Sequence, residues 1–256
     1  MSLDQPGAAM SQRGWLMHRH TETECDMFQV LGERGCGTNV VRKTITKSVR
    51  LHRTEALGWK HGFPAMVAIP RSMIVVCAFR NAFDWAASLY KRPWHADDAM
   101  QSLSFSEFLR APWDGVVDRT TDFEMIHPEL QVDAHMLQFD RHPIHGTRFS
   151  NIFEMRTLKA RSLLGMLQRE SNVVLVRFEA FRDQPEAFVN DLGTVFDLAP
   201  TERGYRPITR NMGNRFRPTV KGREKPPEVW SDEDRAWAMS QLDPDLEAAL
   251  GYHYAD

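Results

Sequence analysis

Cysteine is scarce in this sequence, with only Cys25, Cys36 and Cys77 among 256 residues. Three cysteines form no paired disulfide framework, and such usage is typical of a reducing compartment. No apolar run approaches the roughly 20 residues that a membrane span needs. The first residues include Asp4 and lack the apolar core of a signal peptide. We therefore expect a cytoplasmic protein without a membrane span.

A large charge imbalance is also missing. The formal net charge is -2, which argues against nucleic acid as the main partner. Locally the balance differs, because a stretch near the C-terminus is basic and is offset only by Glu224. Its members are Arg203, Arg206, Arg210, Arg215, Arg217, Lys221, Arg223 and Lys225. This stretch could hold a multiply charged anion, or it could be a solvated basic loop.

What is present fits an ordinary globular protein, with 42% apolar and 26% charged residues. The length suits one large domain, and we see no internal repeat. Residues 1–23 are polar and predicted to be irregular. Residues 24–256 are predicted to form a single α/β domain, with a loop-rich insertion at about 92–150 where four prolines interrupt the pattern (Pro93, Pro112, Pro128 and Pro143).

Apolar runs alternate with helical periodicity along the rest of the chain. The strongest run, residues 72–79 (SMIVVCAF), is typical of a strand buried on both faces. Strands that alternate with helices predict a mostly parallel sheet. The predicted strands are 26–32, 72–79 and 172–178, and the predicted helices are 38–49, 81–91, 152–169, 184–196 and 232–242.

A glycine-containing segment joins the first predicted strand to the first predicted helix. It reads Gly32-Glu33-Arg34-Gly35-Cys36-Gly37-Thr38-Asn39. Backbone amides in such a loop, together with a helix N-terminus, can bind a phosphate-like anion. The lysine of a triphosphate-binding loop is absent, and Thr38 stands in its place. The alternative is a tight strand–helix turn without a ligand.

Two further elements point to the same edge of the sheet. Arg80 ends the strongest strand, and Ser88 lies about two turns into the next helix, so both could meet one phosphate. Lys60 and His61 lie between the loop and that strand, and histidine suits a general base near neutral pH. Taken alone, Arg80 could be a surface residue and His61 a structural one.

Together these elements resemble the sulfotransferases that use 3'-phosphoadenosine 5'-phosphosulfate, over residues 26–92 and 172–252 and in the family's order. The segment 36–40 is similar to the family's S-G-T-T-W, and 60–64 to its K-x-H-x-P. The segment 80–88 carries its R-x7-S signature, 177–185 resembles its Y-E-D element, and 220–223 resembles its R-K-G segment. In two departures, the family's loop lysine falls on Gly35 and its adenine-stacking aromatic on Val40.

The resemblance implies a three-layer P-loop-type fold, with helices on both faces of the sheet, and sulfuryl transfer without a metal. It implies His61 as base, Lys60 as auxiliary cation and Arg34 as substitute for the loop lysine. The 5'-phosphosulfate would be held by Arg34, Gly35, Cys36, Gly37, Thr38 and Asn39. Arg80, Ser88 and Arg223 would bind the 3'-phosphate, Phe178 would stack on adenine, and Lys221 and Gly222 would close over the nucleotide. The acceptor would be a small molecule or a glycan.

Other interpretations stay open at this point. One is a P-loop kinase or NTPase, and another is a non-catalytic nucleotide-binding protein on the same fold. His142 and His145 could belong to a metal site, although they lie in a loop-rich region without helical register. Trp94 and Trp113 could line an acceptor pocket or anchor the insertion.

Overall fold

The computed structural model describes residues 4–123, 128–209 and 216–254. These residues form two compact units. Unit 1 comprises Met1–Asn81, Lys159–Met212 and Asp243–Asp256, and unit 2 comprises Ala82–Leu158 and Gly213–Leu242. Unit 2 contains the loop-rich segment at about 92–150. No helix among the described residues is both long and apolar enough to cross a membrane.

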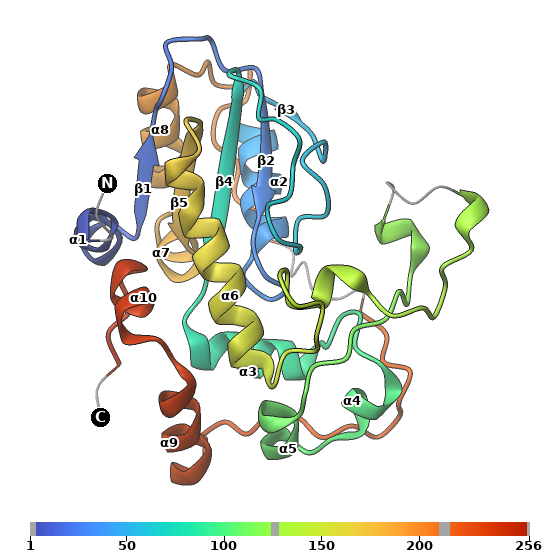
Figure 1. Cartoon of the computed structure of the whole chain (residues 1–256). Coiled ribbons are helices and arrows are strands. Elements are labelled where there is room, and N and C mark those ends of the chain that lie inside the picture. Colours follow the sequence, from blue (N-terminus) through green and yellow to red (C-terminus); the bar gives the residue numbers. More distant parts are fainter. Residues whose placement is uncertain (1–3, 124–127, 210–215, 255–256) are drawn as a thin grey trace. The chain divides into compact units, whose positions relative to one another are not determined.

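Unit 1 is built on a five-stranded sheet with the order β1-β5-β4-β2-β3 (Figure 1). The strands β3, β2, β4 and β5 are parallel neighbours, and β1 pairs antiparallel with β5 at one edge. The predicted α/β class with a mostly parallel sheet is therefore confirmed. The strands are β1 (Trp15–His18), β2 (Met27–Leu31), β3 (His52–Arg53), β4 (Met73–Phe79) and β5 (Asn172–Arg177).

The helices follow most of the predicted ranges. The predicted helix at 152–169 ends its α-helical part at Leu164 and continues as a 3-10 turn over Gly165–Gln168. The α-helices are α1 (Asp4–Gln12), α2 (Thr38–Ser48), α3 (Ala82–Lys91), α4 (Asp98–Ser102), α5 (Phe105–Arg110), α6 (Ile152–Leu164), α7 (Phe178–Asp183), α8 (Pro185–Phe196), α9 (Asp232–Gln241) and α10 (Pro244–Ala249).

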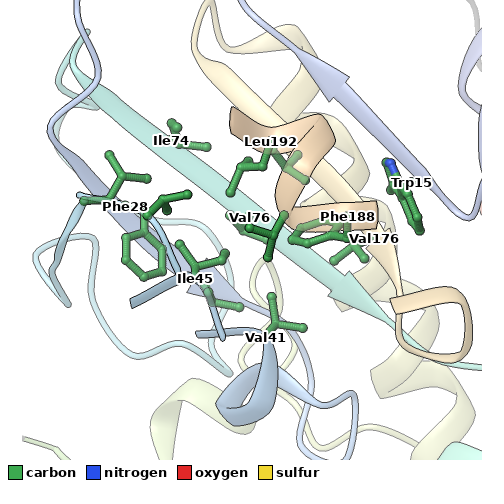
Figure 2. Packing of buried hydrophobic residues seen from close by; sticks show 14 of the residues in the cluster. Trp15, Phe28, Val41, Ile45, Ile74, Val76, Val176, Phe188 and Leu192 are labelled. Carbon is green, nitrogen blue, oxygen red and sulfur yellow. The ribbon is translucent and has the colours of Figure 1, made fainter. Parts of the chain in front are cut away.

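Helices cover both faces of the sheet in unit 1. On one face, α2, α7 and α8 pack against alternate residues of the strands, and Figure 2 shows Val41 and Ile45 of α2 and Phe188 of α8 in this cluster. On the other face, α1, α10 and the end of α6 pack against the intervening residues. All seven residues of β4 are buried, because both of its faces meet helices. Burial of each large apolar side chain contributes about 1.5–3 kcal/mol.

The expectation of an irregular segment over residues 1–23 is wrong for the part that forms α1 and β1. The register pairs Trp15 with Val176, so β1 extends the sheet beyond β5. Helix α1 places Met10 in the core, where it is 0% exposed. Tertiary packing thus stabilises a short helix that contains Gly7, a residue of low helix propensity.

Unit 2 holds short helices and irregular segments around an aromatic core. Trp85 of α3 packs edge-to-face on Phe153 of α6, which in turn packs on Trp237 of α9. Helix α5 begins with a capping box in which the side chains of Ser104 and Glu107 satisfy each other's backbone amides.

Candidate functional site

The carboxyl ends of three parallel strands lie at the same edge of the sheet. Leu31 at the end of β2 pairs with Cys77 of β4, and Phe79 at the end of β4 pairs with Arg177 at the end of β5. The residues that follow these strands are the glycine loop (residues 32–37), Arg80 and Phe178. The sheet register therefore gathers three of the predicted site segments, and ligands in such folds bind at this edge.

The glycine loop leads directly into α2, whose N-cap is Gly37 with a φ of 80° and no side-chain capping bond. A β-carbon added at Gly37 would lie 2.2 Å from the ring of Phe178. Both the left-handed backbone and this close approach require glycine. Because no side chain caps this helix with a hydrogen bond, the first amides of α2 are suited to an anionic ligand.

The Lys60–His61 segment is bonded to the glycine loop. The amide of Gly32 donates to the carbonyl of Lys60 at 2.9 Å, and the Lys60 ammonium donates to Asn39 Oδ1 at 3.0 Å. His61 Nδ1 lies 2.5 Å from the carbonyl oxygen of Gly32. Since a carbonyl can only accept, Nδ1 carries the proton in the neutral ring and Nε2 carries the lone pair. This tautomer is the one that a base acting through Nε2 needs.

Arg80 reaches the same loop from the end of β4. Its Nη1 donates to the carbonyl of Gly35 at 3.0 Å, and its guanidinium lies 5.1 Å from the centre of the Phe178 ring. The next residue, Asn81, donates its amide to Glu179 in α7. Phe178 therefore contacts both Gly37 and Arg80, and it forms a wall beside the loop in addition to any stacking role.

A buried ionic cluster lies against the loop. Glu33 Oε1 accepts from the amide of Arg34 at 2.6 Å and from its Nε at 2.7 Å. Lys159 Nζ, from α6, lies 2.7 Å from Glu33 Oε2. The three side chains are at most 4% exposed. Arg34, the predicted substitute for the loop lysine, is thus held by Glu33 and faces the ring of Trp59 at 5.6 Å.

Two members of this cluster are not predicted by the sequence motifs. Glu33 is one residue of the glycine loop without an expected role of its own, and Lys159 lies on a helix far away in sequence. A signal for Lys159 existed, because it falls between the apolar positions Met155 and Leu163 on the buried side of α6. A lysine on the buried side of a helix needs a charged or polar partner, so it is a candidate for a functional site.

The remaining predicted site residues belong to unit 2. Ser88 is partly buried in α3, while Lys221 and Gly222 are exposed. Arg223 donates to the carbonyls of Gln101 and Tyr90, and its guanidinium lies over the Tyr90 ring. Arg223 thus contacts the helix that carries Ser88.

The predicted 3'-phosphate site is divided between the units, because Arg80 belongs to unit 1 while Ser88 and Arg223 belong to unit 2. Convergence of the three on one phosphate stays a prediction. Two members of the basic stretch, Arg210 and Arg215, lie outside the described residues.

Two other candidates from the sequence have structural partners in unit 2. Trp113 is fully buried, and its indole donates to Asp140 Oδ2 at 3.0 Å, so it anchors the segment. The rings of His142 and His145 stack with centroids 4.5 Å apart. Among the described residues, no group of three or more His, Cys, Asp or Glu side chains could hold a metal ion.

No family model, curated protein or solved structure matches this chain. The chemical capacity of the site is therefore judged from its own residues. The loop edge of unit 1 combines glycine-rich backbone, a helix N-terminus, the cations Lys60 and Arg80, and an imidazole whose tautomer is fixed. Such a set can bind an oxyanion and can take a proton from a hydroxyl or amine held beside it.

Proposed function

We propose that this protein is a sulfotransferase, which moves a sulfuryl group from 3'-phosphoadenosine 5'-phosphosulfate to a hydroxyl or amine of a small molecule or glycan. The proposal includes the finer fold assignment, a P-loop-type α/β domain, and a cytoplasmic location. One observation carries it. The residues of the base element, the loop and the 3'-phosphate element are connected by hydrogen bonds at one sheet edge, through Lys60–Asn39, His61–Gly32 and Arg80–Gly35.

In the proposed reaction, His61 Nε2 takes the proton of the acceptor while the acceptor oxygen or nitrogen bonds to sulfur. The bond between sulfur and the bridging oxygen of the nucleotide breaks, and the electron pair stays on the 5'-phosphate of the leaving bisphosphate. The enzyme must align the reactants in line and stabilise charge on that oxygen. The hydrogen bond from His61 Nδ1 to the carbonyl of Gly32 holds the base at a fixed position beside the loop.

The other residues have roles in donor binding. The amides of the loop and of Thr38 would hold the 5'-phosphosulfate, and Lys60, tethered to Asn39, would act as auxiliary cation. Arg80 would bind the 3'-phosphate, which is the group that distinguishes this donor from ATP. In this scheme the protein's own cations and amides balance the charge of the donor.

The test begins with nucleotide binding. Adenosine 3',5'-bisphosphate should raise the melting temperature, because a ligand that binds only the folded state stabilises it by mass action. Its 3'-dephospho analogue should bind more weakly, and ATP with Mg²⁺ serves as the competing ligand. Stabilisation by ATP–Mg²⁺ without stabilisation by the bisphosphate would favour a kinase or NTPase and reject the proposal.

The second step measures transfer. Donor labelled in its sulfuryl group is incubated with panels of hydroxyl- and amine-bearing metabolites and glycans, and a labelled product is expected for one acceptor class. Bisphosphate binding without transfer to any acceptor, and without slow transfer of the label to water, would favour the non-catalytic nucleotide-binding interpretation.

A further inference from the structure

Lys159 is a buried cation beside the glycine loop that the proposed mechanism has not yet used. It projects from α6, and its side chain is 2% exposed. Burial of an ammonium is costly unless charged partners and hydrogen bonds compensate for the lost hydration. Its position therefore needs an explanation beyond ordinary packing.

The surroundings of Nζ place it between two parts of the candidate site. On one side is Glu33 of the loop, at 2.7 Å from Oε2. On the other side are the rings of Trp59 and Phe63, whose centroids are 5.7 Å and 5.9 Å away. Trp59 and Phe63 flank the Lys60–His61 pair in the chain. The ammonium thus lies between the loop and the segment that carries the proposed base.

We propose that Lys159 supplies the ammonium that the loop itself lacks, since Arg34 is held by Glu33, and that it binds the sulfonate oxygens of the donor during transfer. This inference rests on the proposed function and adds one residue to it. Lys159 stays protonated throughout. It neither takes nor gives a proton, and it forms no covalent bond, but it stabilises the charge that the sulfuryl group carries between donor and acceptor.

The contacts of Glu33 support a positioning role for this carboxylate. Arg34 already engages Oε1 through two donors. Oε2 has no aligned hydrogen-bond donor among the described residues, although Nζ lies within 2.7 Å of it. The Lys159–Glu33 contact is therefore an ion pair without a directed hydrogen bond. The ion pair with Glu33 fixes the location of the ammonium beside the loop, and an ammonium can donate to the oxygens of an anion.

The aromatic walls favour the same role. Trp59 is 7% exposed, and an ammonium over an aromatic ring in a desolvated site is held by cation–π attraction. Exclusion of water lowers the local dielectric constant, which strengthens the interaction of the ammonium with a bound anion. A compact point charge also suits the three equivalent oxygens of a sulfonate, for which a planar guanidinium has no geometric advantage.

The test compares Lys159→Met in two backgrounds, the wild type and Glu33→Gln. If Lys159 acts on the sulfonate, its loss should lower turnover by roughly 10²–10³-fold in both backgrounds, the usual effect of removing one transition-state donor. Binding of adenosine 3',5'-bisphosphate, which has no sulfonate, should change less than about threefold. Lys159→Arg should restore part of the turnover, and Lys91→Met, at an exposed lysine, should leave it unchanged.

The outcomes are separable. If Lys159 only neutralises Glu33, Lys159→Met will be inactive alone but harmless once Glu33→Gln has removed the carboxylate, which overturns the inference. Glu33 also holds Arg34, so Glu33→Gln alone is the reference against which turnover and stability of the double variant are compared. The double variant lacks the buried carboxylate that Lys159→Met would leave without this ion pair, so it serves as the test if Lys159→Met fails to fold. A wild-type protein that binds the bisphosphate but transfers no sulfuryl group overturns the proposed function, and this inference falls with it.

Discussion

Replacement of His61 is the most discriminating perturbation of the candidate site. His61→Ala should cut turnover by roughly 10²–10⁴-fold, which is the usual contribution of a positioned base. In free energy this corresponds to about 2.7–5.5 kcal/mol of activation energy. Binding of adenosine 3',5'-bisphosphate should be nearly unchanged, because the loop and Arg80 stay in place.

The cost in stability can be worked out separately from the contacts of the ring. His61 makes a hydrogen bond to the carbonyl of Gly32 and an edge-to-face contact with Trp59, with centroids 5.4 Å apart. Their loss should lower the free energy of unfolding by about 0.5–1.5 kcal/mol each. For a chain of this size the melting temperature should fall by roughly 2–4 °C per kcal/mol. At 25 °C the variant should therefore remain folded.

The assay uses two variants and a control at one temperature, well below all melting points. His61→Asn can still donate to Gly32 but cannot act as a base, so it should be as inactive as His61→Ala and more stable. His52→Ala removes an exposed histidine on β3 and should leave turnover unchanged. The reasoning is refuted if His61→Asn keeps most of the turnover, or if binding and turnover fall together in His61→Ala.

Three further predictions address other parts of the molecule. Arg80→Ala should weaken the 3'-phosphorylated nucleotide by about 1.5–3 kcal/mol, roughly 10- to 150-fold, relative to its 3'-dephospho analogue in calorimetric titration. Gly37→Ala should destabilise the fold by about 2–5 kcal/mol in chemical denaturation, because the left-handed φ and the ring of Phe178 both oppose a β-carbon. Burial tends to raise the pKa of Asp118, but the hydrogen bonds and charge of His95 outweigh it, so the pKa lies below its usual value. The stability that Asp118 contributes should therefore be complete above pH of about 4 and be lost as the pH falls through the lowered pKa. The difference in unfolding free energy between wild type and Asp118→Asn should therefore shrink as the pH is lowered through this range.

Each of these has a matched control in the same chain. Arg50→Ala removes an exposed arginine and should not alter nucleotide discrimination. Gly204 has a φ of 59°, and a β-carbon added there would have no atom within 4 Å. Gly204→Ala therefore measures the cost of the left-handed backbone alone, without the contact with Phe178. Asp133→Asn removes an exposed carboxylate in unit 2. Equal effects of a variant and its control would contradict the corresponding prediction.

The elements that the sequence predicts well are those with a strong local signal. The run Met73–Phe79 is apolar at every position, and such a run is stable only as a strand covered on both faces. The glycine loop is likewise visible, because strand, glycines and amphipathic helix follow one another without interruption. In these cases the residues that specify the structure are neighbours in the chain.

Elements that depend on distant partners were not predicted. Helix α1 contains Gly7, which disfavours a helix, and it packs against α10. A β-carbon at Gly7 would lie 3.0 Å from the carbonyl of Ala248, so the glycine permits this close approach. The short strand β1 has no alternating pattern of its own, and it is defined by pairing with β5.

The candidate site also has parts that the sequence predicts and parts that it does not. Its backbone scaffold follows from local motifs, but the partners of its buried charges lie on elements distant in sequence. The pairing of Glu33 with Lys159 joins residues separated by nearly half the chain, and only the packing of α6 on the sheet brings them together. The same is true of Phe178, which meets Gly37 only because β5 and β2 end at one edge.

The pairing of β1 with β5 has a consequence for the order in which the chain can fold during synthesis. Trp15 leaves the ribosome well before its partner Val176 is synthesised. Arg177 Nη1 donates to the carbonyls of Met10 and Gly251. The C-terminal end of α1 is therefore held by Arg177, which in turn contacts a residue made later still, Gly251. Strands so far apart in sequence pair slowly, because the chain loses conformational entropy on closing the long loop before the stabilising contacts form. Strand β1 is made before β5 but should be among the last elements to dock, and until then the β1-facing edge of β5 is open to other strands and to chaperones.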